Sequence, residues 1–356
     1  MFDYGKPPAD DEVELTVFGP GYGEAISVHV GDGNWLLIDS CYSPQSKIPA
    51  SLEYLQRIGV PYSNVHTIVA SHWHDDHVKG LSKIVESCSN ATLYISGVFD
   101  NNEARAFLSA YGGRAVANHT AGAKELFSAI SASKRDVNPT LHKTLIWEDV
   151  VQGRNMRAVA FSPTPAASAQ SRAQMAQYLP EIHSPIKQVP ELKPNLEAIV
   201  IHINLGDDAI LLGSDLEDHG ALGWSSILDN TWCLSNQCAS VYKIAHHGSS
   251  TGDHSKIWSK LLTKTPLAAL TPFVKGSVKL PDPTDLIRIL GNTKEAYISS
   301  DGTKRPRMSP ELVKRMGQMA QNIVPVSTGF GAVRFRKKLD SKDWDVKLFG
   351  PAKRLT

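Results

Sequence analysis

The sequence predicts an α+β fold in which two β-sheets are packed between layers of helices. Short segments rich in apolar and β-branched residues recur along the chain, and segments with helical spacing of apolar residues separate many of them. The chain has 356 residues, 42% of them hydrophobic, which is enough for a sizeable core. Two sheets sandwiched between helices accommodate this order of elements.

The amino-terminal part of the chain predicts three strands followed by a helix. The strands are expected near residues 13 to 18, 25 to 30 and 35 to 39, and the helix near 46 to 58. Apolar residues at helical spacing, from Ile48 to Ile58, mark the buried face of that helix.

The next segment predicts a buried strand, a polar loop and a second helix. Residues 65 to 71 are apolar and β-branched, and a helical pattern starts at Gly80. Further strands are expected near residues 92 to 95, 157 to 161, 198 to 204, 208 to 213, 240 to 244, 267 to 270 and 295 to 298.

The spread of these elements over the chain predicts a single domain, residues 1 to 356. Within it, we expect a loop-rich insertion over residues 100 to 194. Its second part, 162 to 194, is rich in Pro, Ser, Ala and Gln and predicts a long loop around at most one short helix. Residues 337 to 356 are expected to form a basic carboxyl-terminal tail.

The polar loop after residue 71 carries the chemistry. It reads His72-Trp73-His74-Asp75-Asp76-His77 and brings several imidazoles and carboxylates into six positions. These are the ligands that Zn²⁺ and similar divalent ions accept. A strand, a ligand-bearing loop and a helix make a rigid mount, and sites in α/β layers tend to lie at the carboxyl ends of strands. The sequence therefore predicts a metal site here.

This hexapeptide resembles the signature of the metallo-β-lactamase-fold hydrolases, and other segments resemble further motifs of that family in the same order. They are residues 34 to 40, 209 to 215 and 241 to 249, each a strand that ends in an aspartate or in histidines. The resemblance extends from about residue 13 to residue 336. It implies the αββα sandwich of that family, two mixed sheets between helical layers.

The resemblance also implies a set of metal ligands for one or two divalent ions, with Zn²⁺ as the first choice and Mn²⁺ as the alternative. One ion would be held by His72 and His74, the other by Asp76, His77 and His247, with Asp215 between them. Asp39 would stand outside this set and orient a ligand histidine. Whether His246 or His247 is the ligand stays open, because neighbours in an extended segment point to opposite sides.

The expected chemistry is hydrolysis by activated water. A bound metal ion lowers the pKa of its water toward neutrality, so hydroxide can attack without a protein nucleophile. Asp76 is the predicted catalytic carboxylate. His246 is expected to act as a hydrogen-bond donor or general acid.

One histidine of the family pattern has no clear counterpart. Candidates are His119, His142, His183 and His202, and for each of them a role outside the metal site is the commoner explanation. Asn195 falls where the missing histidine would be expected. The choice between one and two metal ions therefore stays open.

Finer features resemble the ComEC-like hydrolase branch of DNA-uptake proteins. They are residues 18 to 26, the His-His-Gly-Ser of 246 to 249, and Ser300-Asp301-Gly302. This implies a nuclease or phosphodiesterase. Two alternatives remain: a small-molecule esterase or lactonase with the same metal centre, and a catalytically decayed binding protein.

Charge is unevenly distributed along the chain. Residues 301 to 356 hold thirteen Lys or Arg against five Asp or Glu, so the carboxyl end is a candidate surface for nucleic acid as substrate. The predicted contacts to its phosphates are made by Lys304, Arg305, Arg307, Arg334 and Arg336. The alternative is an ordinary solvated charged face.

Sequence patterns for export and membrane insertion are missing. The amino terminus lacks a basic region followed by an apolar core, and no apolar run reaches the roughly 18 residues of a membrane helix. Four irregularly spaced cysteines do not predict a disulfide framework. We expect a cytoplasmic protein without membrane partners; its oligomeric state is not predicted.

Overall fold

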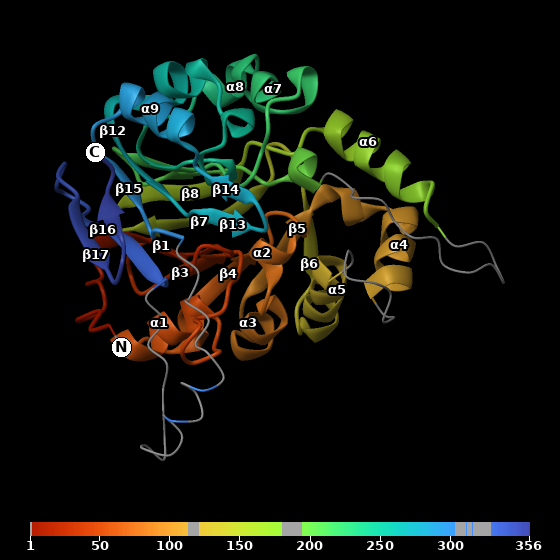
Figure 1. The fold of residues 1–356 in the computed structure, drawn as a ribbon, viewed down its shortest axis with the longest axis horizontal. Helices are drawn as coiled ribbons and strands as arrows, with labels where there is room; N and C mark the ends of the chain where they lie inside the picture. Colours follow the sequence, from red (N-terminus) through yellow and green to blue (C-terminus); the bar gives the residue numbers. More distant parts are fainter. Residues whose placement is uncertain (1, 113–120, 180–193, 303–310, 312–314, 316–328) are drawn as a thin grey trace.

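Two large β-sheets lie face to face between helical layers in the computed structural model (Figure 1). The structure describes residues 2–112, 121–179, 194–302, 311, 315 and 329–356. In this part of the chain each large sheet is mixed and has eight strands. The predicted α+β fold, the αββα sandwich, is confirmed.

The first sheet combines an antiparallel half with a parallel half. In spatial order its strands are β17 (Asp345–Phe349), β16 (Gly331–Lys338), β1 (Glu12–Gly19), β2 (Ala25–His29), β3 (Trp35–Ile38), β4 (Val65–Val69), β5 (Thr92–Ser96) and β6 (Val137–Thr140). Neighbours from β17 to β3 are antiparallel, and those from β3 to β6 are parallel.

The second sheet is also mixed, with its parallel strands near one edge. Its strands, in order, are β18 (Lys353–Arg354), β15 (Ala296–Ile298), β12 (Leu262–Leu270), β11 (Ala239–Lys243), β10 (Ala209–Leu212), β9 (Ile201–Asn204), β8 (Arg154–Ala160) and β7 (Leu145–Val151). Strands β15, β12, β11 and β10 are parallel. A separate hairpin consists of β13 (Phe273–Lys275) and β14 (Val278–Leu280).

Helices cover the outer face of each sheet (Figure 1). On the first sheet they are α1 (Ala50–Ile58), α3 (Leu81–Ser87), α4 (Asn102–Gly112) and α5 (Ala121–Ala132). On the second they are α7 (Trp224–Leu228), α8 (Thr231–Leu234) and α9 (Pro283–Asn292). The helix α6 (Pro165–Ala176) packs on α4, and the one-turn helix α2 (Asp75–Val78) lies within the predicted metal loop.

Alternation along the strands divides the apolar side chains among three layers. In β3, Trp35 and Leu37 join the layer under α1, whereas Leu36 and Ile38 join the layer between the sheets. The reason is that successive side chains of a strand point to opposite faces. Trp224 belongs to the third layer, between the second sheet and its helices. Both sheets are therefore buried on two faces.

The structure differs from the prediction in two regions. The segment expected to be a loop-rich insertion contains three helices, α4 to α6, and three strands, β6 to β8; residues 113–120 and 180–193 lie outside the described part. The expected carboxyl-terminal tail instead forms β17 and β18, which end the two large sheets. A strand was expected at the position of β8, whereas β6, β7, β17 and β18 escaped prediction because they are short or carry many charged residues, such as Glu148 and Asp149 in β7.

Among the described residues, no helix has both the length and the apolar character needed to cross a membrane.

The topology brings the carboxyl ends of two parallel strand pairs to one place. In the first sheet β3 runs into Asp39, and its parallel neighbour β4 runs into the histidine loop. In the second sheet β10 runs into Asp215, and its parallel neighbour β11 runs into His246 and His247. Both sheets thus contribute to one site.

Candidate metal centre

The predicted metal loop is fixed between the two sheets. It leaves β4 at Val69 and enters α2, whose first turn contains Asp76 and His77, both buried. The carbonyl of Ser71, at the start of the loop, accepts a hydrogen bond of 2.9 Å from the amide of Ile199, which precedes β9. The loop is therefore held from the first sheet and from the segment leading into the second.

Four buried side chains meet at the centre of this site. Possible ligand atoms of Asp76, His77, Asp215 and His247 all lie within 4.8 Å of one another. His247 Nε2 lies 3.2 Å from an oxygen of Asp76 and 3.4 Å from Asp215 Oδ2. His77 Nε2 lies 3.3 Å from the same oxygen of Asp215.

The other two predicted ligands adjoin this group. His72 Nε2 lies 3.2 Å from His74 Nδ1, so these two nitrogens share one small volume. The ring of His72 is 4.2 Å from the ring of His77 between centroids. All six side chains predicted as ligands are thus brought together; their binding of metal remains a prediction.

Asp39 supports one histidine of the cluster from behind. Its Oδ2 accepts a hydrogen bond of 2.7 Å from His77 Nδ1, and both carboxylate oxygens also accept from Ser71. Because Nδ1 is occupied, His77 presents Nε2 to the cluster. Asp39 thus contacts a histidine of the cluster, and its role in orienting a metal ligand stays a prediction.

A second buried chain of contacts supports His247, and sequence reasoning missed it. His247 Nδ1 donates to the carbonyl oxygen of Thr271 at 3.1 Å, and Thr271 Oγ1 donates to Glu24 at 2.6 Å. The same oxygen of Glu24 pairs with the Lys243 ammonium at 2.6 Å, and both charged side chains are fully buried. A lysine inside the apolar strand β11 was the signal that could have revealed this network.

Carboxylates dominate the electrostatics of the cluster. Burial by itself would lower the pKa of His247, but Asp215 and Asp76 raise it to about 9, and Asp215 likewise raises the pKa of His77. Burial acts against the charged form of Asp215, yet His77 and His247 hold its pKa well below the ordinary value. The centre therefore favours positive charge.

Two buried atoms without a hydrogen-bond partner indicate which kind of positively charged group fits the cluster. His77 Nε2 and Asp215 Oδ1 are buried without a hydrogen-bond partner. Buried polar atoms are normally paired, and imidazole nitrogens and carboxylate oxygens are preferred donors for Zn²⁺ and Mn²⁺. The donor set formed by His72, His74, Asp76, His77, Asp215 and His247 fits a divalent metal ion.

The two adjacent histidines have different surroundings. Both have backbone φ in the left-handed region, 46° for His246 and 52° for His247, which is uncommon outside glycine. His247 lies in the cluster, whereas His246 Nδ1 contacts Thr251 Oγ1 at 2.9 Å and its Nε2 lies 3.4 Å from Asn195 Nδ2. Sequence could not separate the two, because the turn that separates them depends on this backbone conformation.

No further histidine joins the cluster in the described part of the chain. His142 contacts Phe161 O and Asn230, and His202 Nε2 lies 2.8 Å from Gln237 O, so both have structural partners elsewhere. His119 and His183 lie outside the described residues. Asn195 lies beside His246, and its buried Oδ1 has no partner.

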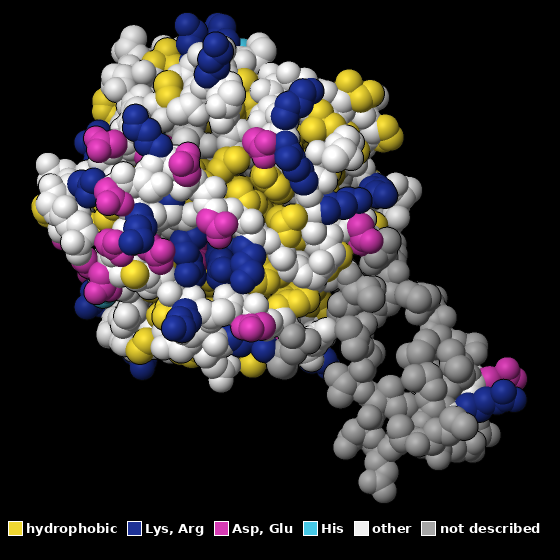
Figure 2. Space-filling model, turned by 90° about the vertical axis from the view of Figure 1, so that its left-hand side faces the viewer, with side chains coloured by type: hydrophobic (Ala, Val, Ile, Leu, Met, Phe, Trp, Pro, Cys, Tyr) yellow, Lys and Arg dark blue, Asp and Glu magenta, His cyan; other side chains and the backbone are white. Residues whose placement is uncertain are grey.

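The predicted cationic surface is corrected in part. Arg334 is buried and donates to the carbonyl of Tyr4, and Arg336 forms an ion pair with the buried Glu14 at 2.6 Å. Arg334 is occupied inside the protein, and Arg336, whose side chain is 16% exposed, is paired with Glu14, so neither offers a free guanidinium group to phosphate. Lys304, Arg305 and Arg307 lie outside the described residues. Figure 2 shows Lys and Arg side chains mixed with Asp and Glu on this side of the molecule.

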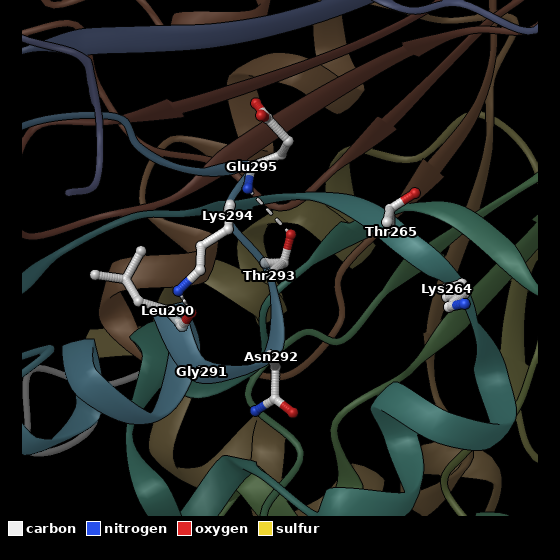
Figure 3. A pocket seen from close by; sticks show the side chains of 8 residues that line it. All are labelled: Lys264, Thr265, Leu290, Gly291, Asn292, Thr293, Lys294 and Glu295. Atoms are coloured by element: carbon white, nitrogen blue, oxygen red, sulfur yellow. Dashed lines mark hydrogen bonds between the residues drawn. The ribbon is translucent and has the colours of Figure 1, made fainter.

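A surface hollow of about 340 Å³ lies away from the cluster, lined by residues 264–265 of β12 and 290–295 at the end of α9 (Figure 3). Its polar groups serve the fold: Lys294 Nζ donates to Leu290 O, and Thr293 Oγ1 donates to Pro266 O. It adds nothing to the candidate site.

A sequence model described as the metallo-beta-lactamase superfamily matches residues 19–170, which include Asp39 and the whole histidine loop. The matched stretch is less than half of the chain, and over that stretch the chain is similar to the metallo-β-lactamase superfamily. The superfamily consists of metal-dependent hydrolases, and the cluster described above is a possible metal site of that kind. No curated protein matches the chain in sequence.

Solved metallo-β-lactamase structures resemble the chain weakly. The metallo-β-lactamase fold protein YhfI from Bacillus subtilis is 13% identical to this chain, with a TM-score of 0.34. The match covers 65% of this chain and 70% of YhfI. A metallo-β-lactamase with a HARLDQ motif from Cronobacter sakazakii is 17% identical, with 66% and 75% covered and a TM-score of 0.37. At these values the likenesses assign neither activity nor substrate.

Proposed function

We propose that this protein hydrolyses phosphodiester bonds with one or two divalent metal ions, Zn²⁺ first and Mn²⁺ as the alternative, as a cytoplasmic nuclease or phosphodiesterase of the ComEC-like branch. The observation that carries the hydrolase proposal is the buried cluster of Asp76, His77, Asp215 and His247, assembled from both sheets. The choice of phosphodiesters is supported by the resemblance of residues 18 to 26 and 246 to 249 to that branch.

The side chains of the centre have distinct parts in this proposal. The metal would be held by the six predicted ligands and would supply a water of lowered pKa as the nucleophile. Asp39 and Thr271 fix the rings of His77 and His247, so that each presents Nε2 to the cluster.

His246 is assigned the proton transfer to the leaving oxygen. Its side chain is 18% exposed, so it can meet a substrate at the mouth of the centre. Nδ1 is held by Thr251 at 2.9 Å, whereas the contact of Nε2 with Asn195 is long, at 3.4 Å. Nε2 is therefore the atom that exchanges the proton.

The test compares the wild-type protein with His74→Ala and Asp215→Ala. Metal content and cleavage of single- and double-stranded DNA, RNA, small phosphodiesters and carboxylic esters are measured for each. We expect bound divalent metal and phosphodiester cleavage in the wild type, and loss of most activity in both variants. His66→Ala is the matched control, since His66 is an exposed histidine of β4, the strand that leads to the loop.

Each alternative predicts a different result. Ester cleavage without phosphodiester cleavage would select a small-molecule esterase or lactonase. A wild type that binds no metal and cleaves nothing would select a decayed binding protein. Full activity in Asp215→Ala would overturn the assignment of the centre.

A further inference from the structure

The hairpin β13–β14 places an aromatic and cationic surface beside the metal centre. The ring of Phe273 lies 5.3 Å from the ring of His247 and 5.5 Å from that of Tyr22, between centroids. The ammonium of Lys275 lies 5.2 Å from the centre of the Tyr22 ring. None of these three residues is used in the catalysis proposed above.

The strand register determines which side chains of the hairpin face the centre. Phe273 and Lys275 are alternate residues of β13, so they share one face, and the contact of Phe273 with His247 identifies that face as the one toward the metal ligands. Val274 and its cross-strand partner Lys279 belong to the opposite face. Lys279 is thus a second exposed lysine of the same hairpin that points elsewhere.

Backbone hydrogen bonds fix this surface relative to the centre. The amide of Val274 donates to Gly21 O at 2.6 Å, which joins the hairpin to the segment that contains Tyr22. In the same segment the amide of Glu24 donates to Asp76 O at 2.8 Å. The hairpin, the segment of Tyr22 and the cluster are therefore connected by backbone hydrogen bonds.

The exposure and charge of these side chains suit an anionic, aromatic ligand. Tyr22 and Phe273 are half-buried, and Lys275 is exposed. Burial acts against its charged form, but Tyr22, Asp75 and Asp76 raise the pKa of Lys275, so the ammonium stays charged. The accessible faces of aromatic rings stack on unpaired bases, and ammonium groups bind backbone phosphates as point charges.

We propose that Tyr22, Phe273 and Lys275 form a subsite for single-stranded nucleic acid, in which the rings receive an unpaired base and Lys275 pairs with the phosphate next to the one that is cleaved. The proposal rests on the proposed function and names its substrate class. Single strands are specified because stacking requires a base that is not paired in a duplex.

The experiment measures binding without requiring turnover. The purified protein is titrated into a fluorescein-labelled oligothymidylate with phosphorothioate linkages, which resist hydrolysis, and fluorescence anisotropy is followed from low to high NaCl. Lys275→Met is compared with Lys279→Met and with Tyr22→Leu. A single lost phosphate contact should reduce the slope of log affinity against log salt by about 0.7 in Lys275→Met.

The variants separate charge from stacking. Tyr22→Leu should weaken binding about fivefold or more and leave the salt slope unchanged. Lys279→Met should behave as the wild type. Equal affinity and slope for Lys275→Met and Lys279→Met, or no binding by the wild type, would overturn the subsite.

Hydrolysis is followed separately, with bis(p-nitrophenyl) phosphate as the substrate. Oligonucleotide binding that depends on Lys275, without cleavage of any phosphodiester, would leave the subsite standing and overturn the proposed function. Cleavage of bis(p-nitrophenyl) phosphate, combined with equal binding by Lys275→Met and Lys279→Met or with no oligonucleotide binding by the wild type, would overturn the subsite and leave the proposed function standing.

Discussion

At the scale of the residue, His202 illustrates how burial decides the chemistry of a histidine. It lies in the apolar strand β9, where a metal-binding role had to be weighed against a place in the core. The ring stacks on Phe161 at 5.0 Å, and Nε2 donates to Gln237 O. Its Nδ1 is buried without a partner, so a proton there would be an unpaired buried charge.

This environment predicts a pH dependence of stability. Burial, together with the weaker effect of Arg157, lowers the pKa of His202 from 6.5 to about 4. Between these values the unfolded chain binds a proton that the folded chain does not, so the free energy of unfolding falls as pH drops from 6.5 toward 4, by about 3 kcal/mol from this residue. Urea unfolding of wild type and His202→Phe, both in chelator, measures it. Parallel curves for the two proteins would contradict the prediction.

At the scale of the element, helix α5 packs directly against the histidine loop. Gly122, in its first turn, is buried against the backbone between His72 and Asp75. A Cβ at this position would lie 1.9 Å from Trp73 O, far inside van der Waals contact. The loop can keep its path only because this residue has no side chain.

Gly122→Ala should therefore displace the loop and weaken metal binding by roughly 10- to 100-fold, the range seen when supports of metal ligands are lost. Metal retained after dialysis against a chelator measures the effect. Gly291→Ala is the matched control: Gly291 also lies in a helix, α9, but a Cβ there meets nothing within 4 Å. It should keep the metal and gain up to about 1 kcal/mol of stability. Equal metal retention in both variants would show that the histidine loop can move aside for the added methyl group without losing metal.

The buried pair Glu24–Lys243 connects β11 to the segment before β2. Both groups have lost their water, so removing one leaves an uncompensated charge. Lys243→Met alone should reduce the free energy of unfolding by about 3–5 kcal/mol. The double variant Glu24→Gln/Lys243→Met should recover much of that loss, as denaturant unfolding can measure. A double variant no more stable than the single one would mean that the pair stabilises by packing instead of charge.

At the scale of the whole molecule, the carboxyl-terminal segment closes both sheets. It supplies β17 to the first sheet and β18 to the second, and Trp344 donates to Ser240 of β11. Phe349 is 5% exposed and packs on Tyr4, whose ring lies 4.8 Å away. Phe349 is therefore part of the core.

Phe349→Ala should destabilise the protein by about 3–5 kcal/mol, the cost of emptying a buried aromatic site. Leu348→Ala is its neighbour on the same strand, 38% exposed, and should cost about 1 kcal/mol or less. Denaturant midpoints of the two variants provide the comparison. Equal, small losses would mean that this segment is a dispensable tail.

The order of apolar segments was sufficient to predict many of the strands, and the spacing of His72, His74, Asp76 and His77 to place the polar loop, because periodicity and ligand spacing are local properties. That this loop binds metal stays a prediction. The local pattern of apolar residues did not predict β7 and β17. These strands pair with their neighbours in the sheet although their own sequences lack a clear alternation of apolar and polar residues. Tertiary structure alone decided that His247 enters the cluster, that Glu24 and Lys243 support it, and that Arg334 and Arg336 are already paired within the protein. The physical reason is that these outcomes depend on contacts between segments far apart in the chain, which composition and spacing do not encode.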